Sequence, residues 1–180
     1  MPIPEITTIE QFHYNLNMGP GYDSYSELLK ATNFSEDELK RICHFREDRH
    51  SRICLYDSPS LEALATCWKS GQKSAIHNYD FNHGWVKILS GRLSLQYFVL
   101  KDGKPEKSNE IDLHTGDTFY LNDNLGYHRF LNKSDGTALA LFIYSDKVTH
   151  WTAYDVEENK FTEVETAYDH HLDEDLSHDT

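Results

Sequence analysis

The chain of 180 residues has little cysteine, and the spacing of its three thiols matches no zinc finger. Cys43, Cys54 and Cys67 are odd in number, so we expect free or buried thiols rather than disulfides. No apolar run approaches the length that spans a bilayer, and the first residues lack the basic and apolar regions of a signal peptide. These absences predict a cytoplasmic protein that does not bind membranes.

Basic side chains are also scarce, with 17 Lys and Arg against 30 Asp and Glu and a formal net charge of −13. Because like charges repel, this excess argues against nucleic acid or an anionic membrane as a partner. Acidic residues are frequent after Val156, where Lys160 is the only Lys or Arg. We expect residues 169–180 to form a solvated acidic tail.

The remaining sequence divides into a short helical part and a long β part. Ser24–Glu27 and Ser35–Glu38 have the spacing of capping boxes, which predicts helices over residues 27–32 and 35–46. Residues 1–20 predict no regular element. We interpret residues 1–47 as a helical cap on one side of the domain.

From Ser51 onward, β-prone runs recur at roughly ten-residue intervals between turn signals, which is typical of a sandwich or barrel. We therefore predict a single all-β domain, with residues 48–168 forming the barrel. The predicted strands cover residues 51–56, 61–68, 85–89, 93–100, 110–114, 118–121, 128–131, 137–145, 150–156 and 160–167.

A candidate metal site follows from two separated segments. On a strand His77 and Tyr79 share a face, because side chains alternate with period two. His128 lies between two other predicted strands. Two imidazoles on one barrel face can hold a mid-row metal with open positions for a substrate. The chain has 11 histidines, so this pair alone is weak evidence and its context decides.

That context resembles the two sequence motifs of the cupin superfamily. Gly71, His77, position 79 and the closing Gly91 have the spacing of the first motif, and Gly126-Tyr-His128 resembles the second. A narrower resemblance, to the cysteine dioxygenase (thiol dioxygenase) family, covers roughly residues 48–160. The segments that match it in order and spacing are Ser51-Arg52, Cys67-Trp68, Ser74–Asn78, Asn82–Gly91, Tyr120–Arg129 and Leu141–Ser145.

The resemblance implies a cupin (double-stranded β-helix) barrel and a mononuclear Fe(II) centre on three histidine positions, here His77, Tyr79 and His128. It implies an oxidoreductase that converts a small carboxylated thiol, cysteine or a relative, to its sulfinic acid with O2. Arg52 would pair with the substrate carboxylate, and Tyr144 would donate a hydrogen bond near the dioxygen position. Members of the family are often monomeric, so a monomer is expected.

Four positions depart from the family pattern. Tyr79 replaces the second ligand histidine, and a tyrosine ligates as a phenolate, which favours ferric iron. Phe142 replaces the histidine of a serine-histidine-tyrosine relay, and His50 replaces a tyrosine near the arginine. Gly84 replaces the cysteine that crosslinks to a tyrosine in mammalian members, so that thioether cannot form.

These departures leave alternatives open. His83 could replace the missing imidazole, but the family usually has a non-ligating histidine there, so we expect no ligand role. The chain could also be an altered cupin that binds a small anionic ligand without thiol dioxygenation. A third possibility is a cupin that uses another metal, such as zinc or nickel.

Overall fold

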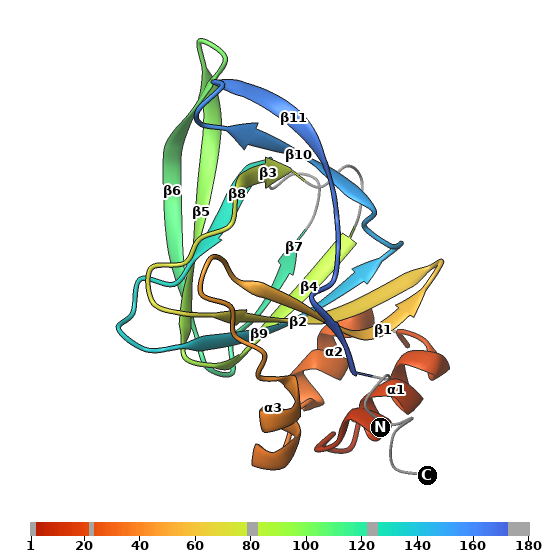
Figure 1. The fold of residues 1–180 in the computed structure, drawn as a ribbon. Helices are drawn as coiled ribbons and strands as arrows, with labels where there is room; N and C mark the ends of the chain where they lie inside the picture. The colour runs from red at the N-terminus through yellow and green to blue at the C-terminus, as the bar shows by residue number, and fades with distance from the viewer. Residues whose placement is uncertain (1–2, 22–23, 79–82, 122–125, 173–180) are drawn as a thin grey trace.

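The computed structural model describes residues 3–21, 24–78, 83–121 and 126–172, and this part of the chain forms two facing six-stranded sheets beside three helices (Figure 1). The first sheet, in the order β12-β1-β2-β9-β4-β7, contains β1 (Ser51–Ser58), β2 (Leu61–Trp68), β4 (His83–Ser90), β7 (Thr118–Leu121), β9 (Ala138–Ser145) and β12 (His170–His171). The second, in the order β11-β10-β3-β8-β5-β6, contains β3 (Ile76–Asn78), β5 (Arg92–Lys101), β6 (Lys104–His114), β8 (Tyr127–Leu131), β10 (His150–Asp155) and β11 (Lys160–Glu165). The predicted all-β fold is confirmed, with two packed sheets in place of one closed barrel.

The interior between the two sheets contains an apolar core that borders directly on the candidate site. Alternation along each strand turns every second side chain inward. Leu64, Val86 and Phe142 of the first sheet pack with Leu95 and Phe130 of the second. Three of these side chains, Leu64, Phe130 and Phe142, also line the cavity of the candidate site, together with polar and ionisable side chains.

The outer face of the first sheet is covered by the helices α1 (Ile9–Met18), α2 (Ser24–Ala31) and α3 (Glu36–Ile42), which lie beneath β1, β2 and β9 in Figure 1. Apolar side chains of the helices, such as Phe12 and Leu29, form a second core with Ala63 and Leu141 of the sheet. The predicted helical cap therefore covers one side of the β domain.

Helix α1 corrects the prediction that residues 1–20 lack regular structure. Thr8 caps it by accepting a hydrogen bond from the Gln11 backbone, and the Gln11 side chain accepts one from the Thr8 backbone. The sequence Thr-Ile-Glu-Gln is thus a capping box that the sequence interpretation missed. The predicted helix over 35–46 begins as expected after Ser35 but ends at Ile42.

The chain after Ala167 also differs from the prediction. His170–His171 form β12, which runs parallel to β1. The Asp169 carboxylate accepts two hydrogen bonds from Arg49, at 2.7 and 2.9 Å, and one from the Arg52 backbone N–H, at 2.9 Å. The predicted tail boundary is thereby corrected: residues 169–172 are folded onto the domain, and residues 173–180 lie outside the described residues.

Gly91 closes the turn between β4 and β5 and is held there by space and conformation. Its φ is +77°, and a Cβ at this position would lie 2.3 Å from the Thr137 carbonyl oxygen. Only glycine fits such an approach without backbone movement. The chain thus turns where the sequence predicts it, but the predicted hairpin is wrong: β4 pairs with β7 and β9 in the first sheet, whereas β5 pairs with β6 and β8 in the second.

Among the described residues, no helix is both long and apolar enough to cross a membrane.

Candidate active site

His77 and His128 are direct cross-strand neighbours on the inner face of the second sheet. They pair in register between β3 and β8, and the next strand places Tyr97 opposite His128. The two imidazole centroids are 4.6 Å apart. Directly opposite residues on adjacent strands point to the same side of a sheet, so two histidines 51 positions apart in sequence share one site.

Backbone carbonyl groups orient both imidazoles in the same way. His77 Nδ1 lies 2.8 Å from the Ala75 carbonyl oxygen, and His128 Nδ1 lies 2.9 Å from the Gly126 carbonyl oxygen. A carbonyl oxygen only accepts hydrogen bonds, so each Nδ1 must be the protonated nitrogen. Nε2 is then the lone-pair nitrogen of each ring, and an Nδ1–H anchored on a carbonyl is the usual support of a metal-binding histidine.

Both imidazoles are held in the neutral form at neutral pH. Their side chains are buried, and burial lowers the pKa of His77 to about 4 and that of His128 well below its usual value. Neutral imidazole is the form that binds metals. The chemistry of the two side chains therefore fits a mid-row metal ion.

Arg52 faces the histidines from the first sheet. Its side chain is 9% exposed, and its Nη2 donates to Oε1 of the fully buried Glu62 at 3.2 Å. The guanidinium carbon lies 5.1 Å from the centre of the Trp151 ring, whose centroid is 4.7 Å from that of His77. Trp151 thus lies between the arginine and the imidazole pair.

One small cavity, with a volume of about 20 Å³, brings the predicted residues together. Arg52, His77 and Tyr144 line it, whereas His128 adjoins it through His77. The other residues that line it are His50, Leu64, Thr66, Trp68, Ser74, Phe130, Phe142 and Trp151. The cavity is therefore lined by a cation, two imidazoles, a phenol and two aliphatic hydroxyl groups, together with five apolar side chains.

Phe142 and His50, two positions that depart from the family pattern, both stack on neighbouring aromatic rings. The Phe142 ring stacks on Tyr144, with centroids 5.8 Å apart, and meets Phe130 edge to face. The His50 ring stacks on Trp68 at 4.0 Å, and burial lowers the pKa of His50 to about 3. Phe142 offers no hydrogen bond to Tyr144, as its side chain predicts.

Two further sequence candidates have different outcomes. Tyr79 lies outside the described residues, so its predicted ligand role stays a prediction. His83 is exposed, stacks on Tyr120 and forms a hydrogen bond to that hydroxyl through Nδ1. A Cβ on the next residue, Gly84, would point at Tyr144 inside the sandwich. Because side chains alternate along a strand, His83 points to the outer face. This placement agrees with the expectation that His83 is not a ligand.

No group of three or more His, Cys, Asp or Glu side chains that could hold a metal occurs within the described ranges. Of the three predicted metal ligands, the described ranges bring His77 and His128 together. A third protein ligand, if there is one, must come from a residue type outside that set or from the undescribed positions.

Sequence reasoning missed three residues that surround Arg52, namely Glu62, Trp151 and Tyr168. Glu62 accepts hydrogen bonds from the Tyr168 hydroxyl, at 2.6 Å, and from the Val148 backbone N–H, at 3.3 Å. Burial, and then the bond to Glu62, raise the pKa of Tyr168 above its usual value, so this phenol stays a donor. The available signal was a single carboxylate within the apolar run of β2; the places of Trp151 and Tyr168 depend on the packing of distant strands.

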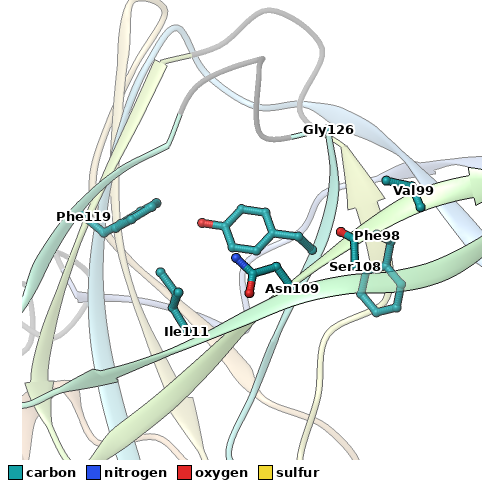
Figure 2. Close-up of a pocket in the computed structure, with 8 residues that line it drawn as sticks. Phe98, Val99, Ser108, Asn109, Ile111, Phe119 and Gly126 are labelled. Carbon is teal, nitrogen blue, oxygen red and sulfur yellow. The ribbon is translucent and has the colours of Figure 1, made fainter.

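A second, more open hollow of about 510 Å³ lies where β5, β6 and β7 meet. Figure 2 shows Phe119 facing Asn109 and Ile111 across it, with Phe98 and Val99 on the far side. Tyr97, the cross-strand neighbour of His128, also lines it. The hollow is therefore lined by the residue of β5 that pairs directly with His128 of β8.

A family model and similar curated proteins both identify cysteine dioxygenases as relatives of this chain. A family model described as cysteine dioxygenase type I matches residues 21–157. The cysteine dioxygenase type 1 proteins of Rattus norvegicus and Homo sapiens are each 33% identical over 93 residues, which is 49% of this chain and 46% of theirs. The match therefore spans about half the length of these relatives.

Solved structures support the fold. A double-stranded β-helix domain protein from Klebsiella pneumoniae aligns with a TM-score of 0.51 at 14% identity, covering 74% of this chain and 96% of its own. A Thermus thermophilus protein aligns with a TM-score of 0.50 at 16% identity, covering 63% and 97%. The two facing sheets are thus the double-stranded β-helix that the sequence predicts.

Proposed function

Because the chain belongs to the cysteine dioxygenase type I family, we propose that it is an iron-dependent thiol dioxygenase that converts a small carboxylated thiol to its sulfinic acid with O2. Cysteine and 3-mercaptopropionate are the substrates to test first. The observation that supports this proposal is the shared site of two carbonyl-anchored imidazoles and a buried arginine. A cytoplasmic monomer remains the expectation.

His77 and His128 would hold the metal through Nε2, with Tyr79 as the third ligand or replaced by water. When bound, ferrous iron supplies the redox chemistry by which dioxygen oxidises a thiol. The other roles fall to the protein: the guanidinium of Arg52 binds the substrate carboxylate, as a planar donor suited to two oxygens. Tyr144, which is buried and lines the same cavity, would donate a hydrogen bond from its hydroxyl near the dioxygen position. The apolar side chains of the lining, Leu64, Phe130 and Phe142 among them, would limit the access of bulk water to the thiol.

Oxygen uptake and product analysis test this function. Protein purified without added metal is assayed for iron, zinc and nickel, reconstituted anaerobically with ferrous iron, and mixed with each thiol in aerated buffer. We expect uptake above the protein-free rate and a sulfinic acid product by mass spectrometry. An absence of both after reconstitution would contradict the proposal.

A second candidate function is favoured by Phe142. Because a phenyl ring supports no relay to Tyr144, the site could bind a small anion, with or without a metal, and leave it unoxidised. In that case 3-mercaptopropionate binds to the reconstituted protein while oxygen uptake stays at the protein-free rate. A protein that contains zinc or nickel as isolated would point to the third possibility, a cupin with another metal.

A further inference from the structure

Glu62 is a carboxylate in a position where an unpaired charge would be costly. It is 0% exposed and is flanked by apolar residues along β2. A buried carboxylate is tolerated only when it is paired and its oxygens accept hydrogen bonds. Glu62 meets that condition with three donors, two on Oε1 and one on Oε2.

The donors on Oε1 are Arg52 and Tyr168, and both also touch each other. The Arg52 guanidinium carbon lies 5.8 Å from the centre of the Tyr168 ring and 5.1 Å from that of Trp151. Two rings and one carboxylate therefore restrict how the guanidinium can rotate. Tyr168 comes from the segment that Asp169 and β12 attach to β1, so the C-terminal part of the chain contributes to this restraint.

Arg52 keeps hydrogen-bonding capacity in this orientation. A guanidinium has five N–H donors, and the bond to Glu62 uses one of them. Nε is buried and has no hydrogen-bond partner among the described residues. An unsatisfied buried donor is costly, so this arrangement favours a ligand that brings an oxygen acceptor into the cavity beside His77.

We propose that Glu62 is a positioning residue of the substrate site, supported by Tyr168, which directs the remaining donors of Arg52 toward the carboxylate of the thiol. The inference rests on the proposed function for the identity of the substrate. It adds that carboxylate selectivity depends on Glu62 and Tyr168, neither of which need touch the substrate.

Tyr168→Phe is the primary variant, because it removes one hydroxyl and keeps the ring over Arg52. Glu62→Gln is the second variant, and Tyr56→Phe is the matched control, since it deletes a phenol hydroxyl bonded to Asn17 outside the cavity. Two thiols of equal length are compared: the acid 3-mercaptopropionate, with a carboxylate, and the alcohol 3-mercaptopropan-1-ol, with a hydroxyl in its place. The readouts are kcat and KM from oxygen uptake, and Kd from anaerobic calorimetry.

For Tyr168→Phe we expect both KM and Kd to rise about three- to tenfold when the acid is the substrate, the equivalent of one lost hydrogen bond. The kcat stays within about twofold. The KM measured with the alcohol is unchanged, as are all values for Tyr56→Phe. Glu62→Gln also raises the KM for the acid relative to the KM for the alcohol. A Tyr168→Phe protein with unchanged preference, or with equal losses for both thiols, would overturn the inference.

Calorimetry separates this inference from the proposed function. If the wild-type protein binds the acid but consumes no oxygen, the proposed function fails, and the Kd ratio between variants still decides the role of Glu62. If the wild-type protein neither binds nor oxidises it, both proposals are wrong.

Discussion

The imidazoles of His77 and His128 are oriented by their own strand backbones, since each Nδ1 contacts a carbonyl oxygen two residues earlier in the chain. This support requires no second side chain. It makes the orientation of the pair robust to substitutions elsewhere in the cavity. The metal-binding prediction can therefore be tested at the histidines themselves.

His77→Ala should lose metal affinity by more than the roughly 10- to 100-fold that loss of an outer-shell partner costs. His83→Ala is the matched control, because its ring stacks with Tyr120 on the outer face and should leave the affinity unchanged. Competition with a metal-binding dye measures both. Equal affinity of wild type and His77→Ala would contradict the assignment.

Gly84 shows how closely Tyr144 is packed. A Cβ on Gly84 would lie 2.9 Å from two ring atoms of Tyr144 and 3.4 Å from Leu121 Cβ. Such overlap in a packed interior typically costs about 1–3 kcal/mol. We expect Gly84→Ala to lower the free energy of unfolding by that amount and to displace the phenol.

Gly136→Ala provides the control for this substitution, since a Cβ there meets nothing within 4 Å. Urea denaturation monitored by tryptophan fluorescence compares the two variants. Equal stability of Gly84→Ala and Gly136→Ala would show that the Tyr144 ring can move aside without cost.

Among the elements, β12 and the segment before it attach the C-terminal part of the described chain to the strand that bears Arg52. Asp169 connects this segment to Arg46, Arg49 and the backbone of Arg52, and its side chain is only 12% exposed. Because Asp169 accepts from the Arg52 backbone and β12 pairs with the next two residues of β1, the segment stabilises the strand that bears Arg52.

Asp169→Ala should lower the free energy of unfolding by about 1–3 kcal/mol, because it leaves the Arg52 N–H without its acceptor and removes charged hydrogen bonds. Asp37→Ala is the control: its ion pair with Lys40 is 92% exposed on the carboxylate side, and such pairs contribute little. Urea denaturation again measures both, and a loss below about 0.5 kcal/mol for Asp169→Ala would contradict the structural role.

At the scale of the whole molecule, the buried His77 and His128 and the partly buried His50 couple stability to pH. Burial lowers the pKa of His50 to about 3 and of His77 to about 4, and it also lowers that of His128. In the unfolded chain each histidine takes up a proton near pH 6.5, whereas the folded state does not. Stability is therefore fully present above pH 6.5 and is lost as the pH falls toward 4.

For chelator-treated protein we expect a slope of up to about 1.4 kcal/mol per pH unit for each of these histidines between pH 6.5 and 4. His50→Phe keeps a ring against Trp68 and should reduce the slope by the contribution of one histidine. Exchange of the exposed His114 for Gln is the control and should leave the slope unchanged. Urea denaturation at several pH values measures this, and constant stability across that range would contradict it.

The amino-acid sequence by itself determined the class of fold and the candidate ligands. Period-two alternation predicts strands and Gly91 predicts a tight turn, because both signals are local in the chain. The motifs around His77 and His128 predict the family, because local spacing is preserved when a strand keeps its register. Arg52 and Tyr144 were found from the same matches.

Tertiary structure alone decided which side chains meet between the sheets. The pairing of β3 with β8 is non-local, and so is the packing of Arg52 between Trp151 and Tyr168. The sequence pattern of β2 showed a charged residue in an apolar run but not its partner, since an ion pair depends on distance in space rather than along the chain. For that reason Glu62 and the folded segment at Asp169 emerged only once the sheets were assembled.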